Sequence, residues 1–445
     1  MYQFPKDLYA DVRIEEFQNL WLCMKNGEMD SDGAMQTVGA LIRVFDGTMW
    51  YSCTTNKLDE IQAELDNLAA LAIPNPEILE HPVVQNFQVH QDTVLRFEGD
   101  RDLRKVARKE WKQLLDHYVE ACIDEEIPEI NSWRVNVDYG YRKKSFFSSK
   151  GAAIVQDIQN CSLGIGFGIT IDGITTGGGK GYSKFYFDEL LGHEEEILQE
   201  RDRTLEFAKK AVKLEPGEYT CVLAPVSTAM FVHESFGHKS EADFMLNDKT
   251  LQEEWIMGKQ VGSEKVSICD RGDLLNHGYC PYDDEGTKAG EVWLMREGVL
   301  TGRLHDAKSA AALSEPITGN ARAQGYHNFP IVRMTNTFMT AGQDDPQKMI
   351  EEVKDGVYIY SVDYGTGQAT FTIKPAISYR IRDGKLAEPV RINVLTGSVF
   401  QALFDIDAVG TDYELFDTYT CGKGGQTVVV SAGGPSIRVK RLTVN

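Results

Sequence analysis

The sequence predicts an α+β protein in which an N-terminal mixed α/β region is followed by a mainly β, barrel-like or closed-sheet C-terminal domain. Two patterns lead to this expectation. In the first half of the chain, strand-like runs are interrupted by stretches with apolar residues at helical spacing. In the second half, many short strand-like runs alternate with glycine-rich turns, which is typical of barrels and sandwiches. We place the boundary at Glu215-Pro216-Gly217, so that residues 1–214 form the N-terminal region and residues 215–445 the C-terminal domain.

The N-terminal region is expected to open with short strands and to contain three helices. A hairpin signal, Asp46-Gly47, separates two of the strands. The strand-like runs are residues 10–17, 19–24, 38–45, 49–53, 133–141, 144–148 and 153–172, and the helical runs are residues 59–71, 103–123 and 194–212. A glycine-rich run at residues 177–181 fails the template of a phosphate-binding loop, because Gly181 stands where Ser or Thr must bind magnesium. We interpret this run as a flexible hairpin loop.

The C-terminal domain is expected to be built from strands with one clear helix between them. Asp345 provides an N-cap for that helix, Pro346 fits its first position, and Gly356 ends it. The strand-like runs are residues 266–270, 291–296, 358–363, 369–373, 377–381 and 427–430.

Net charge, apolar stretches and cysteine spacing exclude several classes of protein. The formal net charge is −21, from 46 basic and 67 acidic residues, which argues against direct binding of nucleic acid. No apolar stretch approaches the roughly 20 residues that span a membrane, and the N-terminus lacks a leader pattern, so we expect a cytoplasmic protein without membrane attachment. The eight cysteines form no C-x-x-C pair, which makes a disulfide framework unexpected.

The chemistry of the chain concentrates in His233-Glu234-Ser235-Phe236-Gly237-His238, which follows an apolar run at residues 219–225. Ser227 offers an N-cap for a helix over this stretch. Neutral imidazoles are the commonest zinc ligands, and a glutamate beside the first histidine is the usual general base of zinc peptidases. In the familiar H-E-x-x-H motif the two histidines share one helix face.

The two histidines of this sequence are five residues apart, not four. On an ideal helix their rings would point roughly 140° apart. His233 and His238 can therefore reach one metal only if the helix distorts, either by a π-type turn or by ending at Gly237.

A catalytic zinc needs a third protein ligand, and the residues alone leave several choices open. Glu241 lies three residues beyond His238, which suits a helical continuation, whereas Cys421 is followed by glycines that free the backbone to present a thiolate. The candidates are Glu241, Asp243, Cys269, His277, Cys280 and Cys421. Arg333 and Asn336 are guesses for a donor to the reaction's oxyanion. We interpret the Asp283-Asp284-Glu285 cluster as a turn rather than a second metal site.

The segments 215–225 and 233–238, followed by Glu241-Ala242-Asp243, resemble the TldD/PmbA family, and specifically its TldD-type zinc metalloproteases with H-E-x-x-x-H and then E-x-D. The C-terminal loop Cys421-Gly422-Lys423-Gly424-Gly425-Gln426 matches the family's C-G-K-x-G-Q pattern. Residues 283–287, 319–322 and 330–337 match in the same order, while Ser235-Phe236 and Lys239-Ser240 depart from the usual residues. The resemblance implies that His233, His238 and Cys421 bind zinc and that Glu234 is the general base.

The resulting expectation is a zinc-dependent metalloprotease that cleaves unfolded or flexible peptides. Open strand edges near the zinc would bind such a peptide as an added strand. The resemblance also implies a homodimer, or a heterodimer with a PmbA-like chain. The alternative is a non-catalytic peptide-binding or regulatory subunit of such a complex. A cysteine hydrolase with Cys421 as nucleophile is a weaker hypothesis, because no histidine lies near Cys421 in the sequence.

Overall fold

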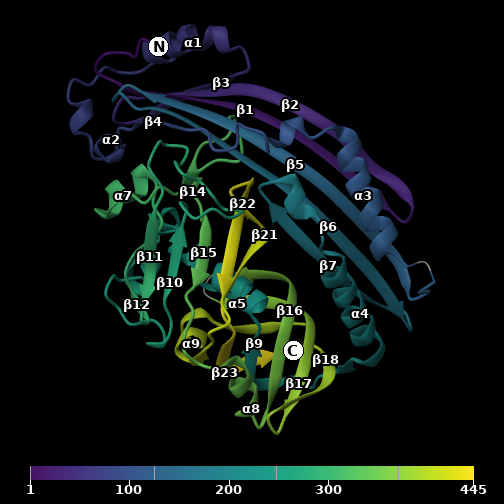
Figure 1. Ribbon diagram of the computed structural model, residues 1–445. Coiled ribbons are helices and arrows are strands. Elements are labelled where there is room, and N and C mark those ends of the chain that lie inside the picture. The colour runs from purple at the N-terminus through teal and green to yellow at the C-terminus, as the bar shows by residue number, and fades with distance from the viewer. Residues whose placement is uncertain (1, 125, 247, 368–369) are drawn as a thin grey trace.

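The computed structural model describes residues 2–124, 126–246, 248–367 and 370–445, and it confirms an α+β protein that is rich in strands (Figure 1). A long curved sheet from the N-terminal half arches over a β-rich body from the C-terminal half. The predicted boundary between residues 214 and 215 remains a prediction. Strand β8 (Val212–Lys213) precedes it and pairs with β18 (Lys385–Arg391) beyond it.

The N-terminal sheet has the strand order β3-β2-β1-β5-β6-β4, with β7 paired to β6. Its strands are longer than the sequence suggested, because runs predicted as separate strands join across polar residues that face a cleft or solvent. The bounds are β1 Tyr9–Lys25, β2 Glu28–Phe45, β3 Trp50–Thr55, β4 Gln91–Val94, β5 Ile130–Ser148, β6 Ala153–Ile171 and β7 Ile174–Lys184.

One face of this sheet is covered by two helices, α3 (Arg108–Cys122) and α4 (Glu194–Lys210). Odd-numbered residues of β5 and β6 point toward the helices, as the alternation along a strand requires. The shared core contains Trp111, Leu114, Leu115, Tyr118, Val135, Val137, Leu163, Ile165 and Phe167. Two further helices lie near the N-terminus, α1 (Ile61–Leu71) and α2 (Pro82–Asn86).

The prediction that residues 177–181 form a hairpin loop is wrong. These residues lie inside β7, and the turn is at Asp172 and Gly173, which both have positive φ. A Cβ on Gly178 would lie 2.2 Å from Oγ1 of Thr204 in α4. The glycine is therefore needed where the helix packs closely on the strand.

The C-terminal half contains a closed barrel, as predicted. Its strands follow the order β16-β9-β23-β19-β17, and pairing of β17 with β16 closes the ring. The bounds are β9 Gly217–Leu223, β16 Asp355–Gly367, β17 Thr370–Arg382, β19 Leu395–Ser398 and β23 Ile437–Val444, with β20 (Ile406–Val409) attached to β23. Of the predicted strand 369–373, residue 369 lies outside the described residues.

A second C-terminal sheet has the order β12-β11-β10-β15-β22-β21. Its strands are β10 Ile268–Arg271, β11 Glu291–Arg296, β12 Val299–Leu300, β15 Asn336–Met339, β21 Glu414–Lys423 and β22 Gln426–Gly434, and β13 (Ala321–Arg322) pairs with β14 (Ile331–Val332). The short helices are α5 Pro225–Phe231, α6 Lys249–Glu254, α7 Ala307–Leu313, α8 Pro346–Glu351 and α9 Val399–Phe404. Helix α8 has the predicted Asp345 cap but ends before Gly356, which belongs to β16. None of the helices in the described ranges is long and apolar enough to cross a membrane.

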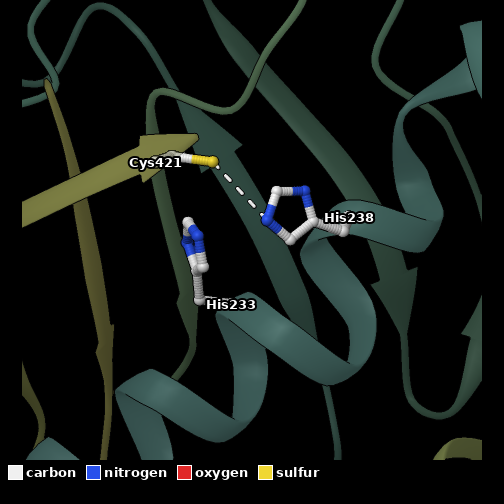
Figure 2. A group of neighbouring side chains, drawn as sticks. All are labelled: His233, His238 and Cys421. Carbon is white, nitrogen blue, oxygen red and sulfur yellow. Dashed lines mark hydrogen bonds between the residues drawn. The ribbon is translucent and has the colours of Figure 1, made fainter. Parts of the chain in front are cut away.

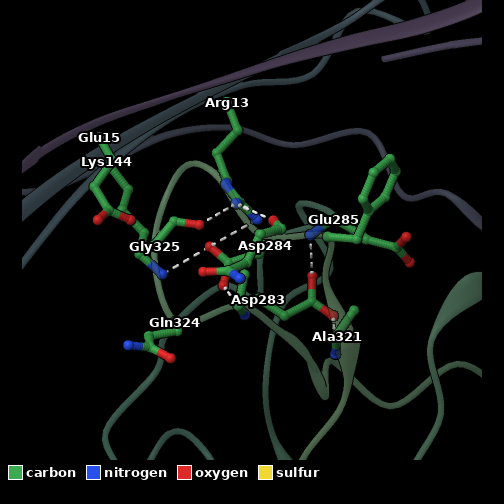
Figure 3. A network of polar contacts seen from close by, with 12 residues as sticks. Arg13, Glu15, Lys144, Asp283, Asp284, Glu285, Ala321, Gln324 and Gly325 are labelled. Carbon is green, nitrogen blue, oxygen red and sulfur yellow. Dashed lines mark hydrogen bonds and ion pairs between the residues drawn. The ribbon is translucent and has the colours of Figure 1, made fainter. Parts of the chain in front are cut away.

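The two halves are joined by a buried network of charges (Figure 3). Lys144 of β5 lies 2.7 Å from Asp284, and Arg13 of β1 lies 3.7 Å from the same carboxylate. Burial alone would raise the pKa of Asp284, but the nearby Lys144 and Arg13 outweigh it and hold the pKa below its usual value. Arg43 pairs in the same way with Glu285 at 3.2 Å. The acidic cluster therefore anchors the N-terminal sheet to the C-terminal body.

This network makes a stability prediction. Replacing Lys144 by Met should lower the free energy of unfolding by about 3 kcal/mol, because it leaves a buried carboxylate without its closest cation. Lys143→Met is the matched control on the same strand, since Lys143 pairs with the exposed Glu98 and should contribute less than about 1 kcal/mol. Denaturant unfolding measures both variants, and equal losses would contradict the role of the buried pair.

Candidate metal centre

The predicted histidines lie just beyond α5, which leads out of barrel strand β9. The helix begins at Pro225 after Ala224, so the prediction that Ser227 is its N-cap is wrong. Proline suits the first helical position because it has no N–H to leave unpaired. Ser227 is fully buried inside the helix.

A π turn at Val232–Gly237 follows α5, and it is one of the two distortions that the five-residue spacing left open. The N–H of His238 donates to the carbonyl of His233, five residues back. The wider turn lets both imidazoles face the same point, with ring centroids 5.0 Å apart. A 3₁₀ turn at His238–Ser240 then ends the helical segment.

Gly237 does not supply the distortion through an unusual backbone conformation, because its φ of −56° is ordinary for a helix. A Cβ at this position would lie 2.3 Å from Sδ of Met334. The glycine thus lets the π turn pack tightly against the segment that precedes β15.

Cys421, near the end of β21, completes a group of three side chains (Figure 2). Its Sγ lies 3.5 Å from Nε2 of His238, and the ligand atoms of His233, His238 and Cys421 all lie within 4.8 Å of one another. Arg333 is fully buried and donates to the carbonyls of Cys421 and Gln426, so it holds the β21–β22 hairpin in place.

The other candidate ligands have different partners. Asp243 accepts from Lys423 at 2.6 Å, the Nδ1 of His277 lies 2.6 Å from Oγ of Ser183, and the thiol of Cys280 donates to the carbonyl of Tyr282. Cys269 lies in β10 of the second sheet, away from the histidine pair. The two residues suggested as oxyanion donors instead hold the backbone in place. Arg333 donates to the β21–β22 hairpin, and Asn336 donates to the carbonyls of Arg271 and Leu274.

The electrostatics of the group favour a thiolate. Burial would raise the pKa of Cys421, but hydrogen bonds from His233 and His238 outweigh it and lower the pKa to about 5. Burial would lower the pKa of His238, but hydrogen bonds to Cys421 and Glu241 raise it to about 10. Two imidazoles and a thiolate form a donor set of the kind that binds zinc, and Nδ1 of the buried His233 has no hydrogen-bond partner among the described residues.

Glu234 follows the first histidine and is partly buried. Burial raises the pKa of its carboxyl group. In the described part of the chain its carboxylate forms neither a hydrogen bond nor an ion pair. Two glycines of β16 make room beside it: a Cβ on Gly365 would lie 2.8 Å from Cγ of Glu234, and one on Gly367 would lie 2.0 Å from its carbonyl oxygen.

Behind the metal ligands lies a second layer of charged side chains, Glu241 and Lys423, whose role was not predicted from the sequence. Glu241 is fully buried, and its Oε2 accepts from Nδ1 of His238 at 3.0 Å. Lys423 lies 3.2 Å from that same oxygen and donates to Asp243 and to the carbonyl of Val332. Such a carboxylate fixes the tautomer and orientation of a ligating histidine. The sequence contains features that could have indicated this layer: the acidic residues Glu241 and Asp243 follow His238, and Lys423 lies two residues after Cys421.

A β-rich body that brings two histidines, a cysteine and a free glutamate to one point has the architecture of a metal-dependent hydrolase. Residues 216–445 match the family model of the PmbA/TldA metallopeptidase C-terminal domain, and residues 10–73 match the model of domain 1. The chain therefore belongs to the PmbA/TldD family of metallopeptidases.

The similar proteins cover between 74% and 98% of this chain. A metalloprotease of Archaeoglobus fulgidus is 33% identical over 96% of this chain and 97% of its own length. A zinc metalloprotease TldD homolog of Saccharolobus solfataricus is 32% identical over 74% of both chains. The crystal structure of TldE from Thermococcus kodakarensis has a TM-score of 0.73 at 13% identity, covering 98% of this chain and 96% of that one. At such low identity this structural likeness supports the fold alone.

The second layer leads to a testable expectation for metal affinity. Lys423→Met should weaken zinc binding by about 10- to 100-fold, because Glu241 loses the cation that holds it against His238. Lys440→Met, at an exposed lysine of β23, is the control. Competition with a chromophoric chelator measures the Kd of each variant, and an unchanged Kd in Lys423→Met would rule out this role.

The lowered pKa of Cys421 predicts a thiolate at neutral pH in the metal-free protein. Because the pKa lies below that of an ordinary thiol, the thiolate should persist as the pH falls and be lost only near pH 5. Ultraviolet thiolate absorbance, taken as the difference from a Cys421→Ser variant, follows this titration. A midpoint near the ordinary thiol value of about 8.5 would contradict the expectation.

Proposed function

We propose that the protein is a zinc-dependent peptidase with His233, His238 and Cys421 as metal ligands and Glu234 as general base. The observation that carries the proposal is the convergence of the three ligand atoms within 4.8 Å, next to a carboxylate with no partner in the described chain. The zinc metalloprotease name of the Saccharolobus solfataricus relative supports the choice of metal.

The residues have distinct tasks in peptide hydrolysis. A zinc ion in this donor set would polarise the scissile carbonyl and lower the pKa of a water molecule toward about 7. The Glu234 carboxylate takes the proton of the attacking water and returns it to the leaving amine. Its raised pKa suits both transfers, because a base works best when its pKa lies near the working pH.

We propose an extended, unfolded peptide as the substrate. Strand β16 pairs with β9 only at Gly356–Ile359, so the strand beyond Ile359 pairs with β17 alone among the described strands. That part of β16 passes beside Glu234 at Gly365 and Gly367. An exposed strand edge of this kind can bind a peptide through main-chain hydrogen bonds, which read little sequence but require an unfolded chain.

We also propose a dimer, formed with a second copy or with a PmbA-like chain. In the described structure, β2 pairs with β3 only from Ala40 onward, so its edge from Glu28 to Gly39 is open on that side. Met29 and Met35 on this strand are exposed. A long edge with exposed apolar side chains is suited to pairing with another chain.

The general-base role is tested by Glu234→Gln. The variant should keep its zinc and lose roughly 10²- to 10⁴-fold in kcat, because only the proton acceptor has been removed. Metal analysis and peptide-cleavage kinetics on the same preparation measure both quantities. A variant that cleaves as fast as the wild-type protein would refute the role. If the wild-type protein also cleaves no peptide, the result would favour the non-catalytic subunit instead.

The substrate class is tested with one small protein in two forms, stably folded and destabilised by a core substitution. We expect cleavage of the destabilised form and sparing of the folded one, because only an unfolded segment can join a strand edge. Gel analysis at matched concentration and time compares the two forms. Equal cleavage would remove the requirement for an extended substrate even if the zinc chemistry stood.

A second candidate function arises from the contact between Cys421 and His238. A thiolate 3.5 Å from a charged imidazole is also the arrangement of a cysteine hydrolase. The two functions differ in their need for metal. Peptide cleavage that survives complete chelation and is abolished by iodoacetamide would favour the cysteine mechanism.

A further inference from the structure

A cleft of about 910 Å³ separates the curved N-terminal sheet from the C-terminal body. Its floor is the face of β1, β2, β5 and β6 opposite to α3 and α4. Its other wall is formed by the loop at residues 322–327 and by residues 427–429 of β22. The buried network around Asp284 closes one end, since Lys144 lines both the network and the cleft.

The floor carries three asparagines placed opposite glycines. Asn19, Gly140 and Asn160 are register partners on β1, β5 and β6, so they form one row across the sheet. Asn136 of β5 faces Gly164 of β6 in another row. A Cβ on Gly164 would lie 2.7 Å from Oδ1 of Asn136. The glycines thus leave the amide groups room to project into the cleft.

These amides are not used by the protein itself. Among the described residues, the side chains of Asn19, Asn136 and Asn160 form no hydrogen bond, and Oδ1 of Asn19 is buried without a partner. Native proteins rarely leave a buried polar atom unpaired, so an unpaired one that lines a cavity points to a ligand.

The ligand chemistry follows from the amide group. A primary amide offers one acceptor and two donors, which matches the C=O and N–H of a peptide unit. Asn19 and Asn160 lie two strand spacings apart, about 10 Å, and Asn136 lies four residues, about 13 Å, along β5 from the row that contains Asn19 and Asn160. An extended peptide rises about 3.3 Å per residue, so amides at these separations meet its backbone every three or four residues.

The remaining lining fits a polypeptide of neutral or acidic character. The aromatic rings of Phe17 and Trp21 lie on the same floor and provide apolar contact area. Lys144 is already paired with Asp284, but the other cationic side chains of the lining still outnumber its carboxylates: Arg134, Arg142 and Arg322 against Glu15 and Asp138.

The cleft is separate from the metal centre. Cys421 and Val428 are register partners on β21 and β22, so their side chains share one face of the hairpin. Of the three β22 residues that line the cleft, Thr427 and Val429 point to the face opposite Val428 and Cys421 because side chains alternate along a strand, and the lining contains none of His233, His238 and Cys421.

We propose that this cleft is a second binding site for an extended polypeptide segment, held through main-chain hydrogen bonds to Asn19, Asn136 and Asn160. The inference rests on the proposed peptidase function, since it assigns the occupant as a remote part of the substrate. It predicts that long unfolded substrates bind more tightly than short ones, while the chemistry at the metal is the same for both.

The test measures binding apart from cleavage. The probe is a fluorescein-labelled, unstructured peptide of about 15 Gly, Ser and Ala residues, which spans roughly 50 Å when extended. It is titrated by anisotropy into the full-length, zinc-loaded Glu234→Gln protein. The double substitution Asn136→Leu/Asn160→Leu in that background should raise the Kd about 10-fold, because two hydrogen-bonding groups are lost. Asn393→Leu, at an exposed asparagine, is the matched control and should leave the Kd unchanged.

Two further measurements keep the outcome decisive. Thermal melting and zinc content of the double variant establish that the fold and the metal centre are intact. A benzophenone-bearing copy of the peptide should crosslink to β1, β5 or β6 in the Glu234→Gln protein. Crosslinks confined to residues around the metal centre, or an unchanged Kd in the double variant, would overturn the proposal. So would a change of oligomeric state in the double variant without a change in peptide affinity, because the cleft would then hold a second copy.

The failure of this inference is distinguishable from failure of the proposed function. With a catalytically active protein, the double variant should raise KM for a long substrate about 10-fold and leave kcat and the kinetics of a tetrapeptide unchanged. If no peptide is cleaved by wild type but the Kd effect is present, the peptidase function fails and the binding site stands. If cleavage is normal and the long substrate is unaffected, the binding site fails alone.

Discussion

One hydrogen bond, from the His238 N–H to the carbonyl of His233, sets the geometry on which the candidate site depends. On a regular helix the two imidazoles would diverge, and no third side chain could reach both. The π turn directs both imidazoles toward the same point. The close approach of Met334 leaves space only for glycine at position 237. The distortion is therefore part of the packed core as well as of the metal centre.

Buried cations then join segments that are far apart in the sequence. Arg333 binds the backbone of the β21–β22 hairpin and so fixes the position of the Cys421 thiol. Lys423, from the same hairpin, connects the thiol-bearing strand to Glu241 and through it to His238. In the same manner Lys144 and Arg13 join the N-terminal sheet to Asp284. Removing any of these cations would leave a buried polar group unpaired, so each of them is expected to stabilise the contact between the segments that it joins.

Local patterns allowed most of the secondary structure to be predicted and limited the histidine segment to a π-type turn or a helix end at Gly237, because strand alternation, helix spacing and the five-residue interval are properties of short segments. The choice of Cys421 did not follow from spacing, since β21 reaches the histidines only through the tertiary fold, and the family resemblance selected it instead. The run at 177–181 was misread because the reason for Gly178, the close approach of Thr204, lies in another element. The pairing of Lys423 with Glu241 was missed for the same reason.

The central claim is that two imidazoles and one thiolate of this chain bind a single zinc ion. Zinc K-edge X-ray absorption of the zinc-loaded protein tests it directly, because sulfur and nitrogen ligands give different distances. The account predicts one sulfur at about 2.3 Å with nitrogen or oxygen ligands at about 2.0–2.1 Å, and loss of the sulfur contribution in Cys421→Ser. A spectrum without sulfur, or one unchanged by the substitution, would contradict it.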